Sequence, residues 1–331
     1  MRVAAVQASY VLMDSGATID KVAVLTANAA ANGARLVVFP EAFVPGTPLW
    51  IATRRIWDGD AEWYRLLVEN AIVLGGAACN RLGDIAREND VWLMIGVQER
   101  ELHGASIYNT TLYFSPEGEL VQHHRKLVPT GAERTVWSPG DGSTLAVVQA
   151  GEARIGGLTC WENYMPLARF YLYSQGVEVW LAPTLAAGDA WISTMQHIAC
   201  ENRMFVIGVN PVLHLDAIPA AFPNRDQLVA AYVAGNREWL DEGNTVIVSP
   251  LGVIMGGPIR KREETLYADF DLGVVASERR KMDPAGHYNR PDVFQLLVDL
   301  RHMLMRERLV GVERIASLRV MRVRCGLRAR A

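Results

Sequence analysis

At the centre of the chain stands Gly156-Gly157-Leu158-Thr159-Cys160-Trp161-Glu162-Asn163-Tyr164-Met165-Pro166, where an apolar, strand-like segment gives way to a helix-like one. The small residues before Cys160 are typical of a short buried strand that packs closely. Asn163 can cap a helix that begins near Pro166, because proline is well tolerated in a first helical turn. Cys160 is therefore predicted at the carboxyl end of a strand and near the positive end of a helix, where a thiolate is favoured. The segment alone leaves two interpretations open, a reactive nucleophile and an inert buried thiol.

The composition is that of an ordinary globular protein of 331 residues, with 50% hydrophobic and 21% charged residues. No apolar run reaches the roughly 18 residues of a membrane span, and residues 1–7 resemble a strand more than a signal peptide. We therefore expect a cytoplasmic protein with no membrane partner. The cysteines are widely spaced and form no CxxC pair, which predicts neither a disulfide framework nor a zinc site. They are Cys79, Cys160, Cys200 and Cys325.

The charge is unevenly distributed along the chain, whose formal net charge is −3. From Arg301 to the end there are nine arginines and two glutamates, so the preceding residues are acidic overall. A basic tail can bind nucleic acid or an acidic lipid surface, or it can contact an acidic face of another subunit. The tail lacks the interleaved aromatic residues of a single-strand binder, which favours the subunit contact and predicts no nucleic-acid partner.

Strand-like and helix-like segments alternate along most of the chain. Helical patterns cover residues 18–31, 61–72 and 77–88, and an antiparallel hairpin is predicted for residues 107–115 and 119–124. Other strand candidates are apolar on both faces, which indicates sheets covered on both sides: residues 36–39, 91–97, 179–182, 205–209 and 245–248. The pattern predicts a layered α/β sandwich, with one catalytic domain over residues 1–299 and a basic, helical extension over residues 300–331. Residues 211–243 are expected to form a long irregular loop.

Two further groups share the predicted position of Cys160 at a strand end. Glu41 follows the apolar strand 36–39, and Lys126 follows the second strand of the hairpin. A glutamate can accept the thiol proton, a cysteine can attack an electrophilic carbon, and a lysine can stabilise negative charge. Glu133, taken by itself, reads as a surface-loop residue. Adjacent His123 and His124 point to opposite strand faces, so they do not predict a metal site.

Three blocks of sequence together resemble the nitrilase superfamily of carbon-nitrogen hydrolases, in order and in spacing. The blocks are Phe39-Pro40-Glu41-Ala42-Phe43, residues 124–134 from His124-Arg125-Lys126 to Ala132-Glu133-Arg134, and Cys160-Trp161-Glu162-Asn163-Tyr164-Met165-Pro166-Leu167. The last block, with Gly286-His287-Tyr288-Asn289-Arg290-Pro291-Asp292, is similar to the nitrilase branch proper. The resemblance implies a four-layer αββα sandwich. It also implies that Cys160 is the nucleophile, Glu41 the general base, Lys126 the stabilising cation and Glu133 the second glutamate.

The resemblance implies hydrolysis of an organic nitrile to the carboxylic acid and ammonia through a Cys160 thioimidate, with neither metal nor organic cofactor. Trp161, Glu162, Tyr164, Thr47 and Trp191 are the candidate substrate-binding residues, and Thr47 stands where many relatives carry an aromatic residue. The branch also implies a homo-oligomer, a dimer or a larger spiral or filament.

Two alternatives to this function stay open from the sequence. One is an aliphatic amidase or another carbon-nitrogen hydrolase, because the same side chains can act on a linear amide. The other is a non-catalytic assembly or nucleic-acid-binding protein that uses the basic tail.

Overall fold

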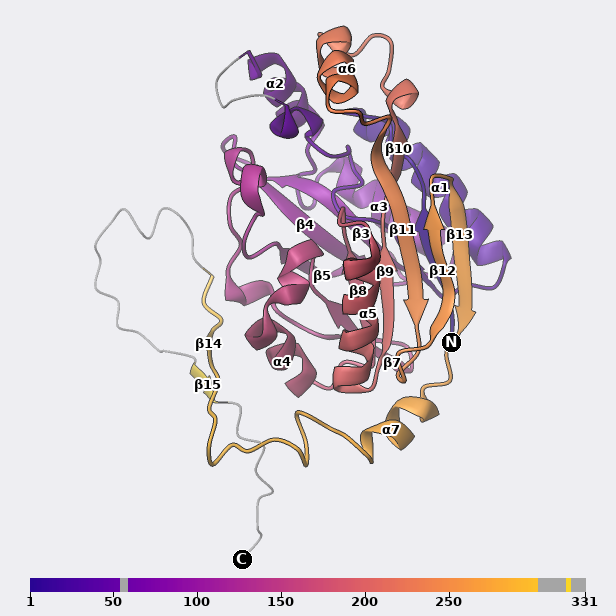
Figure 1. Cartoon of the computed structure of the whole chain (residues 1–331), viewed down its shortest axis with the longest axis vertical. Coiled ribbons are helices and arrows are strands. Elements are labelled where there is room, and N and C mark those ends of the chain that lie inside the picture. Colours follow the sequence, from indigo (N-terminus) through magenta and orange to yellow (C-terminus); the bar gives the residue numbers. More distant parts are fainter. Residues whose placement is uncertain (54–58, 303–319, 323–331) are drawn as a thin grey trace, which may run out of the picture.

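The computed structural model describes residues 1–53, 59–302 and 320–322, and it consists of two stacked β-sheets between two layers of helices (Figure 1). The first sheet has the order β13 (Glu264–Asp269), β1 (Arg2–Gln7), β2 (Leu36–Val38), β3 (Trp92–Arg100), β4 (Ile107–Phe114), β5 (Leu120–Arg125). The second has the order β10 (Val212–His214), β11 (Trp239–Val248), β9 (Phe205–Val209), β8 (Val179–Pro183), β7 (Ala153–Gly157), β6 (Val148–Ala150). Strand β12 (Ile254–Arg260) pairs with β11.

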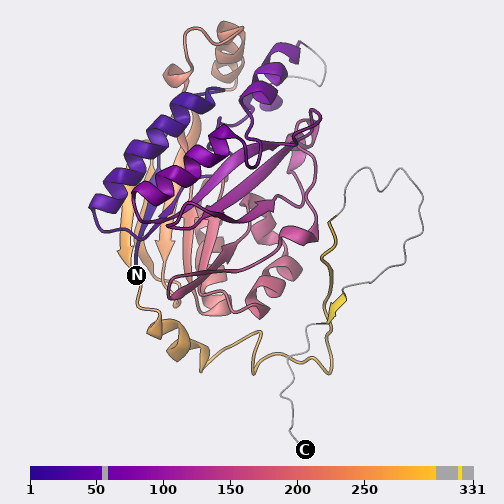
Figure 2. The same ribbon diagram turned by 180° about the vertical axis from the view of Figure 1, so that it is seen from behind.

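Helices cover the outer face of each sheet. Helices α1 (Ser15–Ala31) and α3 (Ala77–Glu88) lie on the first sheet, toward the viewer in Figure 2, and α4 (Pro166–Ser174) and α5 (Asp189–Asn202) lie on the second. Helices α2 (Ala61–Asn70) and α6 (Arg225–Ala234) lie together at one end of the molecule, and α7 (Gly273–Arg279) begins the segment that leaves the sandwich. The expected αββα sandwich is confirmed.

The layers follow from the alternation of side chains along each strand. In β1, Val3 and Ala5 pack between the sheets, whereas Ala4 and Val6 pack under the helices of the first sheet. Strand β8 does the same, with Val179 and Leu181 between the sheets and Trp180 under α4 and α5. Both faces of these strands are therefore buried, which is why their sequences read as continuous apolar runs.

Two sequence-based expectations about local structure are wrong. Residues 211–243 are not one irregular loop, because they contain β10, the 3₁₀ turn η5 (Leu215–Ala217) and α6 before β11 begins. Asn163 does not cap α4, whose N-cap is Met165. The Asn163 side chain donates instead to the carbonyls of Leu158 and Cys160, both at 2.8 Å, and so fixes the turn that carries Cys160.

The chain after α7 runs along one edge of the molecule to β14 (Leu297–Asp299), which pairs antiparallel with β15 (Val320–Arg322). Within the expected basic extension, residues 303–319 and 323–331 lie outside the described residues. The triplet 320–322 is a strand and not part of a helix. None of the helices in the described part of the chain is long and apolar enough to cross a membrane.

Candidate active site

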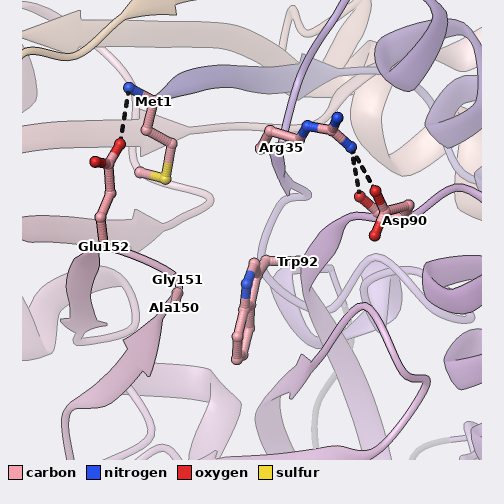
Figure 3. A pocket seen from close by; sticks show the side chains of 7 residues that line it. All are labelled: Met1, Arg35, Asp90, Trp92, Ala150, Gly151 and Glu152. Carbon is pink, nitrogen blue, oxygen red and sulfur yellow. Dashed lines mark hydrogen bonds and ion pairs between the residues drawn. The ribbon is translucent and has the colours of Figure 1, made fainter.

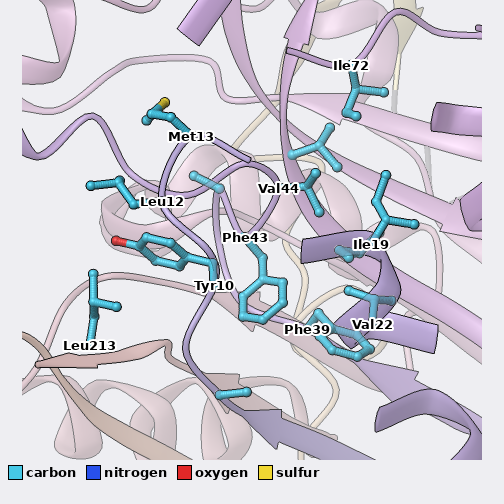
Figure 4. Packing of buried hydrophobic residues seen from close by; sticks show 14 of the residues in the cluster. Tyr10, Leu12, Met13, Ile19, Val22, Phe39, Phe43, Val44, Ile72 and Leu213 are labelled. Atoms are coloured by element: carbon cyan, nitrogen blue, oxygen red, sulfur yellow. The ribbon is translucent and has the colours of Figure 1, made fainter. Parts of the chain in front are cut away.

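Glu41 lies in the loop that follows β2, and aromatic packing on either side fixes this loop. The rings of Phe39 and Phe43 lie 5.3 Å apart, centroid to centroid, and pack with α1 residues in the outer core (Figure 4). Ala42 has a positive φ of 48°, so the chain turns sharply directly after Glu41. The loop lies against Gly96 of β3, where an added Cβ would come within 2.3 Å of the Pro40 carbonyl oxygen. The absence of a side chain at Gly96 lets the Glu41 loop lie against the sheet.

The Glu41 carboxylate is fully buried and held by three donors. Oε1 accepts from the Asn109 amide at 2.7 Å and from the Lys126 ammonium at 2.8 Å. Oε2 accepts from the backbone N–H of Leu185 at 2.9 Å. Three separate elements therefore orient this carboxylate. Their donors also offset the free-energy cost of removing a charged carboxylate from water.

Lys126 follows β5 directly and places its ammonium between two glutamates. Its backbone N–H donates to the Asn109 carbonyl at 2.8 Å, and its Nζ lies 2.7 Å from Oε2 of Glu133. Glu133 sits in the 3₁₀ turn η2 (Gly131–Thr135), where it forms a capping box with Thr130. The structure thus brings the apparent surface-loop residue Glu133 to the buried lysine.

The two carboxylates determine the charge state of this cluster. Burial alone would lower the pKa of Lys126, but Glu41, the Cys160 thiolate form and Glu133 outweigh it and raise that pKa. Burial and the charge of Glu41 raise the pKa of Glu133, and Lys126 opposes them. These charges therefore favour the protonated form of Lys126.

Cys160 begins the 3₁₀ turn η4 (Cys160–Tyr164) after β7, as its position in the sequence predicts. It is 4% exposed and has a positive φ of 53°, a strained conformation for a residue with a side chain. Gly157, at the end of β7, packs so tightly against Leu181 of β8 that a Cβ would overlap its backbone. Glu41, Cys160 and Thr184 all follow strands that run parallel to a neighbour, which brings them to one end of the sandwich.

The surroundings of Cys160 favour its neutral thiol over the thiolate. Burial and the charge of Glu41 raise its pKa to about 12, against the opposing effects of Lys126 and of a hydrogen bond with the Thr184 side chain. These effects oppose the thiolate that the sequence led us to expect, and burial is the largest of them. Such a thiol needs a base to remove its proton during attack, and Glu41 is the buried carboxylate beside it.

Glu162 points away from solvent and into the protein, although it follows Cys160 by only two residues. Its side chain is 0% exposed. Its oxygens accept from the backbone N–H groups of Leu127, at 2.6 Å, and Thr159, at 2.8 Å, and lie near Nε2 of His124. These are all protein groups, so the carboxylate is not directed at open space where a substrate could bind.

The other candidate substrate-binding residues differ in exposure. Trp161 and Tyr164 are 56% and 46% exposed, and their rings contact each other edge to face. Trp191 of α5 is buried and lies edge to face with Tyr164, with ring centroids 6.3 Å apart. Thr47 is buried in the loop after Glu41.

Asn109 and the 184–185 turn are site residues that the sequence did not single out. Asn109 lies within the alternating pattern of β4 and reads there only as a strand residue. Its amide holds Glu41 while its carbonyl holds the backbone of Lys126. Thr184 and Leu185 follow an apolar strand without any charged residue, so no local signal marks them.

A hollow of about 260 Å³ lies at the end of the strands opposite to Cys160, and Figure 3 shows its lining residues. It is lined by residues that precede or begin strands, among them Met1, Arg35, Trp92 and Glu152. Its charges are already paired, Arg35 with Asp90 at 2.7 Å and the amino terminus with Glu152 at 3.4 Å. In α/β sheets, ligands bind outside the carboxyl ends of the strands, which is the end that holds Cys160. Within the described part of the chain, acidic, His and Cys side chains form no group of three or more that could hold a metal.

The fold and the site together define an αββα protein with a buried cysteine, two glutamates and a lysine at one end of its sheets. The profile of the carbon-nitrogen hydrolase family matches residues 2–280, and the chain belongs to this family. Among curated proteins, it is 42% identical to an aliphatic nitrilase of Sinorhizobium fredii over 90% of this chain and 95% of that protein. It is 41% identical to a nitrilase of Bradyrhizobium diazoefficiens over 91% of this chain and 92% of that protein.

Another curated protein and two solved structures are also similar to this chain. A bifunctional nitrilase/nitrile hydratase of Nicotiana tabacum is 37% identical over 90% of this chain and 86% of that protein. A carbon-nitrogen hydrolase structure from Helicobacter pylori superposes with a TM-score of 0.70 at 20% identity, covering 89% of this chain and 96% of the other. An amidase structure from Nesterenkonia, with acrylamide added to its active-site cysteine, has a TM-score of 0.60 at 20% identity and covers 85% and 98%.

Proposed function

We propose that the protein is a nitrilase, which hydrolyses an organic nitrile to the carboxylic acid and ammonia. The observation that carries the proposal is the arrangement of Cys160 beside Glu41, whose carboxylate shares Lys126 with Glu133 at 2.8 and 2.7 Å. The names of relatives that are 37–42% identical over about 90% of the chain support the nitrile as substrate. Neither a metal nor an organic cofactor takes part in the proposed reaction.

The first half of the reaction forms a covalent thioimidate. Glu41 takes the proton of the Cys160 thiol while Sγ attacks the nitrile carbon, and the C≡N triple bond becomes a double bond. Lys126 donates a hydrogen bond to the nitrogen, on which negative charge develops. The proton that Glu41 took from the thiol then passes to this nitrogen, which completes the thioimidate and restores the Glu41 carboxylate. Glu133 holds the ammonium of Lys126 in place during this step.

The second half of the reaction releases ammonia and then the acid. A water molecule deprotonated by Glu41 adds to the thioimidate carbon and gives a tetrahedral species. Both protons of this water pass through Glu41 to the nitrogen as the C–N bond breaks, so ammonia leaves and an acyl-enzyme remains. A second water adds, the C–S bond breaks, and the acid and the Cys160 thiol are regenerated, so two waters are consumed for each nitrile.

The residues around Cys160 would shape the substrate pocket. We assign Trp161, Tyr164 and Trp191 to substrate binding, because their aromatic cluster continues directly from the nucleophile turn. We also assign Thr47, which is buried in the loop that follows Glu41. Glu162 is assigned to support of the catalytic groups instead, since its carboxylate contacts only protein donors.

Turnover assays on nitriles and amides test the proposed reaction. A panel of aliphatic, aromatic and arylaliphatic nitriles is incubated beside the matching amides, and acid, amide and ammonia are all measured. Nitrile turnover with equal amounts of acid and ammonia is expected, and Cys160→Ala is expected to abolish it. Amide turnover without nitrile turnover would instead support the aliphatic amidase. Measuring the amide as a product matters because one relative is named a bifunctional nitrilase/nitrile hydratase.

We further propose that residues 1–299 form the catalytic domain and that residues 300–331 are an extension which contacts other subunits of a homo-oligomer. A groove of about 750 Å³ between α4 and residues 284–296 supports an assembly, because it is rimmed by exposed apolar side chains. These include Leu167, Tyr288, Val293 and Phe294, each more than half exposed. Sedimentation of the full chain and of a chain ending at residue 300 tests the assembly, and a smaller particle is expected for the shorter chain.

The same truncated chain tests the nucleic-acid-binding alternative. Salt-sensitive binding to DNA or RNA that disappears with the tail would favour that alternative.

A further inference from the structure

Glu162 connects the two segments that carry the proposed nucleophile and its cation. Its Oε1 accepts from the N–H of Leu127, the residue after Lys126, at 2.6 Å. Its Oε2 accepts from the N–H of Thr159, the residue before Cys160, at 2.8 Å. One buried carboxylate therefore holds the backbone beside both catalytic groups, although these belong to different sheets.

His124 completes this connection from the strand that carries Lys126. Residues two apart on a strand share a face, so His124 lies on the same side of β5 as the strand end at Lys126. Its Nε2 lies 3.1 Å from Oε2 and 3.3 Å from Oε1 of Glu162, and its Nδ1 lies 3.3 Å from Oγ1 of Thr144. A carboxylate can only accept, so Nε2 carries the proton. The imidazole thereby supplies Glu162 with a third donor.

Burial makes this network sensitive to single changes. His124 is 3% exposed and Glu162 is 2% exposed, so water does not replace a lost partner. The Thr159 hydroxyl adds a capping box with Glu162 and lies 3.1 Å from the Thr111 hydroxyl of β4. The turn η4 is thus tied to the first sheet at Glu162 and again at Thr159.

We propose that Glu162 and His124 are positioning residues that set the placement of the Lys126 ammonium relative to the Cys160 thiol. This inference rests on the proposed roles of Cys160 and Lys126 in nitrile hydrolysis. The polar atoms of both side chains contact protein groups. They act because both backbone N–H groups point at one carboxylate, so the lysine segment and the cysteine turn cannot move apart independently. Catalysis depends steeply on such placement, since a displacement of about 1 Å can cost on the order of 100-fold in rate.

Glu162→Gln is the sharpest single change. The amide has the size of the carboxylate but presents an NH₂ group where one of the two backbone N–H groups needs an acceptor. We expect kcat to fall by about 100-fold with little change in KM. We also expect slower alkylation of Cys160 by iodoacetamide at pH 8, because Lys126 lowers the pKa of the thiol and a displaced ammonium does so less. A purely structural role would lower the thermal midpoint without changing the alkylation rate of the folded protein.

His124 provides a second, independent pair of variants with a matched control. His124→Leu removes the donor to Glu162, so this variant should lose activity and its Cys160 should be alkylated more slowly. His124→Gln keeps an N–H group at that place, so it should retain most of the parental activity and alkylation rate. His123→Leu, on the opposite face of the same strand, should resemble the parent.

Two outcomes of these measurements would overturn the inference. One is parental kcat and alkylation rate in both Glu162→Gln and His124→Leu. The other is loss of activity only in proportion to the unfolded fraction. If the parent protein hydrolyses no nitrile, the proposed function fails, and the alkylation rates still test the connection between Lys126 and Cys160.

Discussion

At the scale of single residues, the site works with a buried thiol that is not acidic. Burial and Glu41 raise the pKa of Cys160 to about 12, so in the proposed reaction Glu41 removes the thiol proton as Cys160 attacks. The sequence placed Cys160 at a strand end correctly, but its proton affinity depends on Glu41, which is far away in the chain and close only in the fold.

Glu41→Gln separates the two effects of this carboxylate on Cys160. Turnover of nitriles is expected to disappear because the base is lost, whereas alkylation of Cys160 at pH 8 is expected to accelerate because a charge that raises the thiol pKa is removed. Mass spectrometry of the alkylated protein measures the second effect. Glu99→Gln, which removes another buried carboxylate of the same sheet, is the control and should leave the alkylation rate unchanged. Slower alkylation of Glu41→Gln would contradict the assigned direction.

At the scale of elements, the sequence predicted much more about regular structure than about contacts between elements. Periodicity predicted α1, α3 and the β4–β5 hairpin closely, because these elements bury one face or alternate regularly. Helix α6 was missed because residues 211–243 are rich in turn-forming residues, and its few buried side chains give only a weak pattern. The roles of Asn109 and Asn163 could not be predicted, since each depends on partners supplied by other elements.

Gly96→Ala tests the close contact between β3 and the Glu41 loop. The new Cβ would lie 2.3 Å from the Pro40 carbonyl oxygen and 2.7 Å from Cα of Glu41, so the loop must move. We expect a loss of about 1–3 kcal/mol in the free energy of unfolding, together with a loss of kcat. Denaturant unfolding and turnover assays measure the two effects. Gly16→Ala is the control, because the nearest atom to a Cβ at this position in the first turn of α1 lies at 3.5 Å. It should lower neither the free energy of unfolding nor kcat.

At the scale of the whole molecule, two layers of helices enclose two sheets that must stay in register for the site to exist. Glu41 and Lys126 extend from the first sheet, and Cys160 and Leu185 follow strands of the second. Tyr10 and Asp241 add another link, because the Tyr10 hydroxyl donates to Asp241 of β11 at 3.0 Å. The three sequence blocks predicted that such a site exists, but only the stacking of the sheets explains how Glu133 and Asn109 join it.

Asp241 predicts a pH dependence of the stability of the whole fold. Burial raises its pKa from the ordinary value near 3.8 to about 7, so the folded protein keeps a proton that the unfolded chain has already released. The stabilising contribution of this proton is complete below the unfolded pKa and is lost as the pH rises through about 7. In Asp241→Asn, the free energy of unfolding should therefore decrease less than in the parent as the pH rises from about 4 to 7. Denaturant titrations across this range test it, with the exposed Asp20→Asn as the control.

Trapping the covalent intermediate tests the central claim, that Cys160 attacks the nitrile carbon. The protein is mixed with a nitrile, quenched in acid and digested, and the peptides are examined by mass spectrometry while ammonia is measured in parallel. We predict an acyl or thioimidate adduct on Cys160 that forms as the nitrile is consumed, and neither adduct nor ammonia from Cys160→Ala. Continued release of ammonia by Cys160→Ala, or an adduct confined to Cys79 or Cys200, would contradict the account.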